Sequence, residues 1–181
     1  MRRCVVLVVL SGCFGDFAAG GAVTPHAPVA PSGDGGYYRV GAGVGWGNAW
    51  GMLQASGDIE AIGDVAAAGG AVRATVFLDS WEGENGVGGL GIVARAFRGA
   101  GIGASVRTDE LSLGFGFGGV VTHGGDWGML DSIDLSVSSY TTTFADRPAM
   151  RSYGVNLGMS LDPELTFKLL ECLGASYCPN D

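Results

Sequence analysis

Few residues of this chain have the types and spacing that enzymatic chemistry requires. A hydrolase or transferase needs a nucleophile and a base, or paired carboxylates, that converge on one site. The only histidine after residue 36 is His123, in VTHGGDWG, which lies between two predicted strands and which we interpret as a turn residue. The glycine-rich stretch GFGFGGV over 114–120 lacks the following helix that a phosphate-binding loop needs. The sequence therefore predicts no catalytic residue, no cofactor and no metal site.

Eight charged residues on the predicted strands form a second set whose types and spacing have a chemical consequence. They alternate with apolar neighbours along the chain and are Arg39, Asp58, Glu60, Arg73, Asp79, Arg95, Arg107 and Asp134. Four are cationic and four are anionic, so they can pair inside a narrow barrel, where an unpaired buried charge is very costly. We therefore interpret them as a ladder of ion pairs in a barrel interior. A proton or ion path is the alternative.

The elements that must position these residues are predicted by a repeated period of two. Apolar residues alternate with glycine, serine or charged residues in the segments 37–46, 52–62, 71–80, 87–97, 102–107, 111–118, 132–138 and 152–161. No helical pattern interrupts them, and their lengths approach the about 9–11 residues that a tilted strand needs to cross a bilayer. The pattern predicts an all-β, eight-stranded antiparallel up-and-down β-barrel over residues 37–161.

The composition of the two strand faces favours a transmembrane barrel. One face is apolar, while the other is mostly Gly, Ser and Thr, which fit the narrow interior of eight strands. Charged residues make up only 15% of the chain, well under the ~25% of a typical soluble domain. Aromatic residues near strand ends are typical of interfacial girdles, and here they are Tyr38, Trp46, Trp50, Trp81, Trp127, Tyr140 and Tyr153. The alternative is a secreted or lipid-anchored soluble β-barrel or sandwich that binds an apolar ligand inside.

The first and last segments of the pattern resemble those of a known class. YYRVGAGVGW (37–46) and RSYGVNLGMSL (151–161) are similar to the opening and closing strands of small eight-stranded outer-membrane barrels of Gram-negative bacteria. The likeness is to the membrane domain of outer-membrane protein A and to alphaproteobacterial surface barrels. It implies an outer-membrane location, membrane lipids as partners, and a structural or surface-interaction role without catalysis. The surface ligand or envelope partner is left unidentified, and a lipid-modifying barrel enzyme is a second alternative.

The N-terminus predicts export from the cytoplasm. Residues 1–12 begin with two arginines, continue with a short apolar run and end in small residues, which is the order of a signal peptide. The segment LSGC that ends at Cys13 resembles the lipobox of bacterial lipoproteins, and this resemblance implies lipidation of Cys13. Cleavage further along, near Ala18-Ala19-Gly20 or after Ala22, with loss of Cys13, is the alternative. Residues 13–36, rich in Ala, Gly and Pro, are predicted to form a flexible linker.

Beyond residue 161 the period of the sequence changes. Asp162 is a predicted helix N-cap followed by Pro163, and leucines then fall at helical spacing, so residues 162–181 predict a short helical tail. Cys172 and Cys178 are an even pair in an oxidising compartment, which favours a local disulfide; a metal site would need further ligands. The net charge of −8, with scattered Lys and Arg residues, argues against a nucleic-acid partner.

Overall fold

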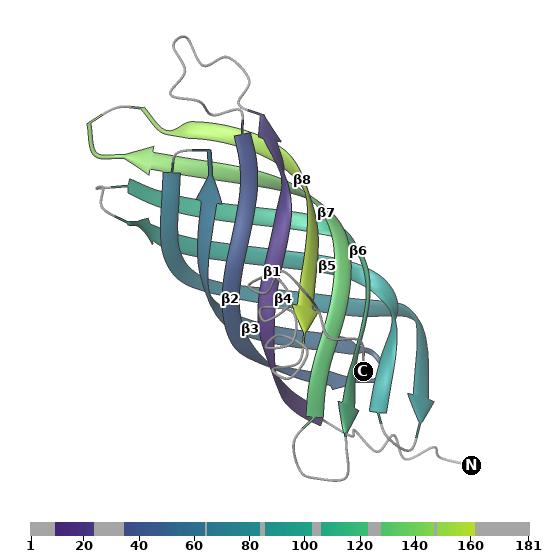
Figure 1. Ribbon diagram of the computed structural model, residues 1–181. Coiled ribbons are helices and arrows are strands. Elements are labelled where there is room, and N and C mark those ends of the chain that lie inside the picture. Colours follow the sequence, from purple (N-terminus) through teal and green to yellow (C-terminus); the bar gives the residue numbers. More distant parts are fainter. Residues whose placement is uncertain are drawn as a thin grey trace, which may run out of the picture.

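The computed structural model of the protein describes residues 10–23, 35–63, 65–83, 86–102, 106–122, 128–146 and 148–161. They form eight strands, which are β1 (Leu10–Val23), β2 (Gly35–Asn48), β3 (Gly51–Ile62), β4 (Val65–Gly83), β5 (Gly86–Gly101), β6 (Val106–Thr122), β7 (Gly128–Phe144) and β8 (Met150–Leu161). Each strand pairs antiparallel with the next, and β1 also pairs antiparallel with β8, which closes the sheet (Figure 1). The all-β, eight-stranded antiparallel barrel that the sequence predicts is therefore confirmed.

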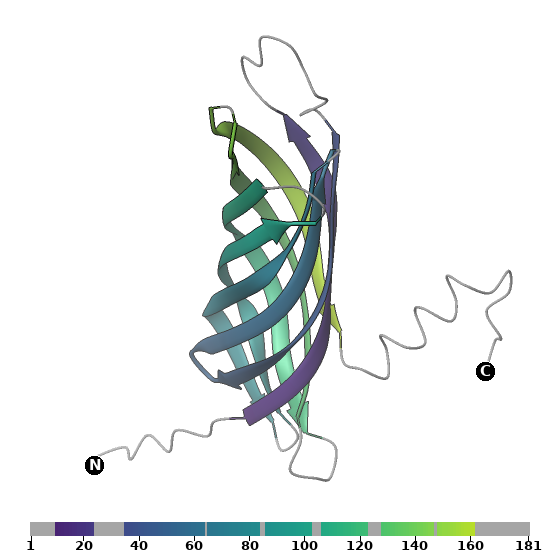
Figure 2. The same ribbon diagram turned by 90° about the vertical axis from the view of Figure 1, so that its left-hand side faces the viewer.

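The two ends of the barrel are distinguished by which strands begin and end there. β1 begins and β8 ends at the lower end in Figure 1, which we call the terminal end. β2 and β4 also end at this end, while β3 and β5 end at the opposite end, which we call the far end. The strands run at a steep tilt to the long axis of the barrel (Figure 2), as closure of a sheet of few strands requires.

The eight strands are not the eight segments that the sequence pattern predicts. β1 occupies residues for which the sequence predicts the end of a signal peptide and a flexible linker, so the linker prediction is wrong for residues 13–23. The alternation of β1 is weak because Ala and Gly fall on both of its faces. Conversely, the segments 102–107 and 111–118 are not two strands, because β6 runs unbroken from Val106 to Thr122. The count of eight agrees because one expected strand is lost and one unexpected strand is gained.

The barrel has an apolar outer face and a polar interior. Outward side chains such as Leu111, Phe115 and Val137 are more than half exposed, at 65%, 62% and 61%. Inward side chains are mainly charged residues, Ser, Thr, Asn and Gln, and they are buried. Glycine leaves room for them: a Cβ added at Gly41 would collide with the carboxylate of Asp58. The alternation of the sequence thus becomes a division between the inside and the outside of the barrel.

Several predicted features lie outside the described residues. They are the C-terminal helix, the Cys172–Cys178 disulfide, His123 and Trp127. Within the described part of the chain, no helix is long and apolar enough to cross a membrane.

Candidate functional site

The barrel interior contains most of the charged residues that the sequence analysis singles out. Six of the eight are at most 6% exposed, namely Arg39, Asp58, Glu60, Arg73, Arg95 and Asp134. Asp16 and Glu110 join them, at 3% and 4% exposed. Among the described residues, the interior therefore holds three guanidinium groups and five carboxyl groups, so the carboxyls outnumber the cations by two. These groups form two clusters, which are linked by a hydrogen bond from Arg39 Nη1 to the Tyr37 hydroxyl at 3.4 Å.

The first cluster has Arg95 at its centre and is called here the Arg95 cluster. It consists of Arg95 on β5, Asp58 and Glu60 on β3, and Glu110 on β6. Arg95 Nη2 lies 2.7 Å from Glu60 Oε1 and also pairs with Asp58, while Nη1 donates to Glu110. The Tyr37 hydroxyl lies 3.1 Å from Glu60 Oε1 and 3.3 Å from Glu110 Oε2, and it can donate to either. One cation and one phenol thus hold three carboxylates.

The second cluster is balanced and is called here the Arg39–Arg73 cluster. Arg39 Nε lies 3.0 Å from Asp16 Oδ2, and Arg39 Nη2 donates to the other oxygen of that carboxylate at 3.1 Å. Arg73 pairs with Asp134 through Nη2 and lies 3.9 Å from Asp16 through Nη1. The same Nη1 donates to Ser160 Oγ at 2.7 Å. Two guanidinium groups and two carboxylates from β1, β2, β4 and β7 therefore neutralise one another.

The prediction of an interior position is wrong for Asp79 and Arg107, which are both exposed. A bulge between Phe77 and Asp79 places Asp79 opposite Leu90, and directly paired residues share a face, so Asp79 points outward as Leu90 does. Arg107 lies on β6 an even number of residues before the outward Leu111, so it also points outward. In both cases the register, and not the local alternation, decides the face.

Asp16 and Glu110 are interior residues that the sequence analysis does not identify. Asp16 lies in the predicted linker, and Glu110 lies in a predicted turn before the segment 111–118. The sequence does contain a signal for Glu110. Leu111 and Leu113 point outward, and Glu110 directly precedes Leu111, so the alternation of a strand places Glu110 inward. For Asp16 the only signal is that it is an isolated acid among Ala, Gly and Phe residues.

Apolar and aromatic side chains occupy the interior on both sides of the two clusters. Toward the terminal end, Phe14, Met52 and Val120 pack together with Phe77 against them. Toward the far end, one group packs together, namely Ala18, Ala22, Tyr37, Ile62 and Tyr140. The rings of Tyr37 and Tyr140 lie 5.2 Å apart between centroids, and Tyr140 is fully buried, so the prediction that it belongs to an interfacial girdle is wrong. The charged clusters are thus enclosed between two less polar layers.

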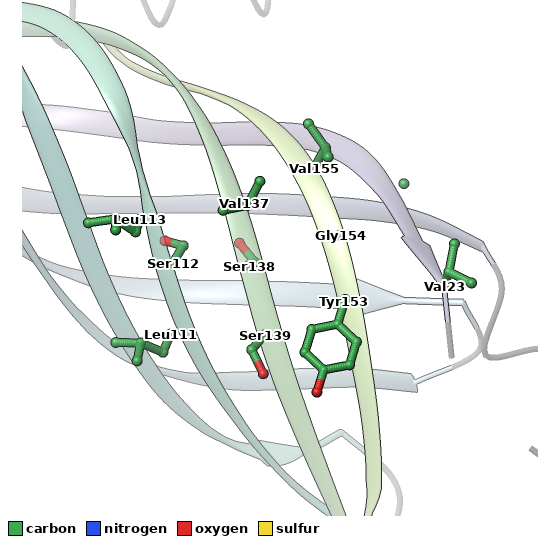
Figure 3. A pocket seen from close by; sticks show the side chains of 11 residues that line it. Val23, Leu111, Ser112, Leu113, Val137, Ser138, Ser139, Tyr153, Gly154 and Val155 are labelled. Atoms are coloured by element: carbon green, nitrogen blue, oxygen red, sulfur yellow. The ribbon is translucent and has the colours of Figure 1, made fainter. Parts of the chain in front are cut away.

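A shallow apolar groove of about 570 Å³ lies on the outer face toward the far end (Figure 3). Its apolar side chains come from β1, β6, β7 and β8, and they are Val23, Leu111, Leu113, Val137, Tyr153 and Val155. Gly21 leaves a gap among them, because a Cβ at this position would meet no atom within 4 Å.

Charged side chains lie on the outer face beyond this groove. Asp109 accepts hydrogen bonds from Arg98 Nε at 2.7 Å and from Arg107 Nη2 at 3.2 Å. These two hydrogen bonds hold the Asp109 carboxylate between the two guanidinium groups. Asp109 is therefore a stable anionic link between two cations at the edge of the apolar face.

These ion pairs and hydrogen bonds join neighbouring and distant strands of the barrel. The buried carboxylates are engaged by guanidinium groups, and no group of three or more His, Cys, Asp or Glu residues in the part of the chain that the structure describes could hold a metal ion. The predicted lipidation residue, Cys13, lies in β1 with its backbone paired to that of Val44. Comparison with protein-family models, with characterised proteins and with solved structures finds no match to this chain. Function therefore has to be inferred from the arrangement of the barrel's own residues.

Proposed function

We propose that this protein is a transmembrane β-barrel of a bacterial outer membrane, with a structural or surface-interaction role and no catalytic activity. The observation that carries the proposal is the polarity of the barrel, with charged groups inside and large apolar side chains outside. In a soluble barrel the apolar side chains fill the interior. A continuous exposed apolar face instead marks a membrane or protein contact, and apolar-out, polar-in alternation is the pattern of membrane barrels.

The extent of the outer face supports this proposal. On β2 the outward residues run from Tyr38 to Trp46, and Val40, Ala42 and Val44 lie between them. This distance is eight residue steps, or about 27 Å along a strand, which becomes roughly 20 Å at a tilt of about 40°. An apolar belt about 25 Å tall is typical of outer-membrane barrels.

Exposed aromatic residues lie toward both edges of the same face. Tyr38 and Tyr153 lie near the far end of their strands, whereas Trp46, Trp50 and Trp81 lie near the terminal end. Trp and Tyr have an apolar body and a polar tip, so they are favoured where a bilayer meets water. Two separated aromatic girdles therefore support a spanning orientation of the barrel.

The contents of the interior favour a closed structural barrel over the alternative functions. The Arg95 cluster and the Arg39–Arg73 cluster fill the middle of the barrel between two apolar layers. An apolar ligand would have to displace buried ion pairs, so an internal apolar-ligand site is not supported. Charge pairs held between apolar layers also favour structural ion pairing over an ion path.

The position of β1 bears on how the leader is removed. Cleavage directly before Cys13 would keep residues 13–23 and hence most of β1, whereas cleavage near Ala22 would remove nearly all of this strand. Retaining β1 matters because it closes the barrel against β8. We therefore retain lipidation of Cys13 as part of the proposal, and an increase in the mass of the mature protein by a diacylglyceryl group would test it.

The spanning orientation is tested by placing a charge on the outer face. Val44→Arg puts a cation inside the proposed belt, two residues from its centre at Ala42. A cation at the centre costs on the order of 2–4 kcal/mol in a membrane barrel. Ala145→Arg puts the same residue in an exposed position after β7. We expect the parent chain and Ala145→Arg to require detergent for extraction and to migrate faster on gels before heating than after it. Val44→Arg should lose the unheated form. Solubility without detergent, or equal behaviour of the two variants, would refute the proposal.

A further inference from the structure

The outer groove lies directly beside a row of charged residues. Leu111, Ser139 and Tyr153 are paired in register across β6, β7 and β8 and lie along the groove. The next outward row is Asp109, Thr141 and Arg151. Two residues separate the rows, so the charged row lies about 7 Å nearer the far end. An apolar depression is thus followed at once by polar and charged groups.

We call the charged side chains beside the groove the rim; they are Arg98, Arg107, Asp109 and Arg151, and their net charge is positive. Arg98 and Arg107 share the single carboxylate of Asp109, which leaves one positive charge, and the exposed Arg151 two strands away adds a second. Side chains of Arg98 and Arg107 are 73% and 49% exposed, so their guanidinium groups remain accessible to a ligand. Arginine is well suited to phosphate because its planar fork can donate two hydrogen bonds at once.

We propose that the groove and the rim together form a binding site for a single anionic phospholipid. An acyl chain lies in the groove over Gly21, and the phosphate contacts Arg107 and Arg151. The inference rests on the proposed membrane function, because the outer face must meet lipid. It goes further by placing a preferred anionic lipid at one position of that face and in the leaflet at the far end.

Charge decides between a lipid and a second copy of this chain as the occupant. A symmetric contact between two copies through the groove would bring the same positively charged rim against itself, which like-charge repulsion disfavours. An anionic lipid instead supplies an apolar chain for the groove and a negative group for the rim. The proposed occupant is therefore an anionic phospholipid, in which no cation of the same headgroup neutralises the phosphate.

The test uses the full chain purified in detergent, after heat-dependent gel migration has shown that it is a folded barrel. Native mass spectrometry then measures the occupancy by phosphatidylglycerol and by phosphatidylcholine with the same acyl chains. We expect one tightly bound phosphatidylglycerol and at least about tenfold weaker binding of phosphatidylcholine, because the net charge of the headgroup meets a cationic rim. Equal retention of both lipids would overturn the proposal.

One variant tests the contribution of the rim to lipid binding, and a second tests that of the groove. A matched control shows whether an added side chain must lie in the groove to have an effect. The double variant Arg107→Gln/Arg151→Gln should lose the preference for phosphatidylglycerol. Gly21→Leu should fill the groove and lower occupancy, whereas Gly57→Leu adds the same side chain in open space on β3, away from the groove, and should not. Unchanged lipid preference in the arginine variant, or equal effects of the two leucine variants, would refute the site.

A further control distinguishes the lipid from phosphate alone. Inorganic phosphate at millimolar concentration should not displace phosphatidylglycerol, because it has no chain for the groove. Complete displacement would refute the lipid assignment. If the barrel never requires detergent, the membrane function itself has failed, and this outcome is visible before any lipid is added.

Discussion

The two charged clusters of the barrel interior have the same kinds of residue but different balances of charge. The Arg95 cluster sets one guanidinium against three carboxylates, whereas the Arg39–Arg73 cluster sets two against two. The boundary between them is narrow, because Arg73 and Arg95 lie directly opposite each other on β4 and β5. Like charges at such positions repel, so each arginine depends on carboxylates from other strands.

The difference indicates which member of each cluster the fold depends on. In the Arg39–Arg73 cluster, every charge has a partner, so removal of any one leaves an uncompensated buried charge. In the Arg95 cluster, three carboxylates share one guanidinium, so the arginine is essential while a single carboxylate is dispensable. Four substitutions test this asymmetry.

The largest effect is expected from Arg95→Met. It leaves Asp58, Glu60 and Glu110 without their cation in the barrel interior, and we expect a loss of about 5 kcal/mol or failure to fold. Urea unfolding in detergent micelles, followed by tryptophan fluorescence and by unheated gel migration, measures it. The control is Arg98→Met on the outer side of the same strand, which should cost less than about 1 kcal/mol. Similar costs for both variants would contradict a special role of Arg95.

Asp134→Asn tests the balanced cluster and should cost about 3 kcal/mol, because it leaves Arg73 without its closest carboxylate. The same unfolding measurement applies. In the double variant Arg73→Met/Asp134→Leu, both charges are removed. Its loss of unfolding free energy should therefore be smaller than the sum of the losses for Arg73→Met and Asp134→Leu measured separately. Additive costs would show that the two residues do not act as a pair.

The packing of the balanced cluster is tested at Gly158, which lies inside the barrel beside it. A Cβ at this position would lie 2.7 Å from Asp134 Oδ1 and 3.0 Å from Arg73 Nη2, so Gly158→Ala should cost about 1–3 kcal/mol. The matched control is Gly57→Ala, where the added Cβ meets no atom within 4 Å. Differential scanning calorimetry or urea unfolding compares the two variants. Equal stability would show that the cluster relaxes to admit a methyl group.

The smallest effect is expected from Glu60→Gln. It lowers the excess of carboxyl groups in the Arg95 cluster while leaving an amide oxygen that can still accept from Arg95 or Tyr37, so we expect a change within about 1 kcal/mol in either direction. Urea unfolding of this variant beside Asp134→Asn gives the direct comparison. A cost as large as that of Asp134→Asn would remove the distinction between the clusters.

The sequence predicts the barrel class and most of the outward positions because a period of two is visible wherever large apolar residues alternate with small ones. Leu111, Phe115 and Val137 are examples of outward positions that agree with the structure. It does not predict β1, where Ala and Gly on both faces remove the contrast. It also places Asp79 and Arg107 on the wrong face. A bulge after Phe77 shifts Asp79, and Arg107 belongs to the start of β6 and not to a separate strand; no residue pattern nearby indicates either feature. The composition of the Arg95 cluster depends on these registers, so its excess of carboxyl groups becomes visible only in the folded barrel.

The seam between β1 and β8 has a consequence for the order of folding. It joins the first and last strands of the described barrel, and Ser160 Oγ reaches Asp16 Oδ1 at 3.4 Å across 144 residues of sequence. Contacts of such high sequence separation form late because loop closure costs entropy, and an unpaired strand edge is a template for aggregation until then. Asp16 has an earlier partner, because Arg39 lies only 23 residues away on the neighbouring strand. β1 and β2 can therefore neutralise their own buried acid before β8 pairs with the other edge of β1.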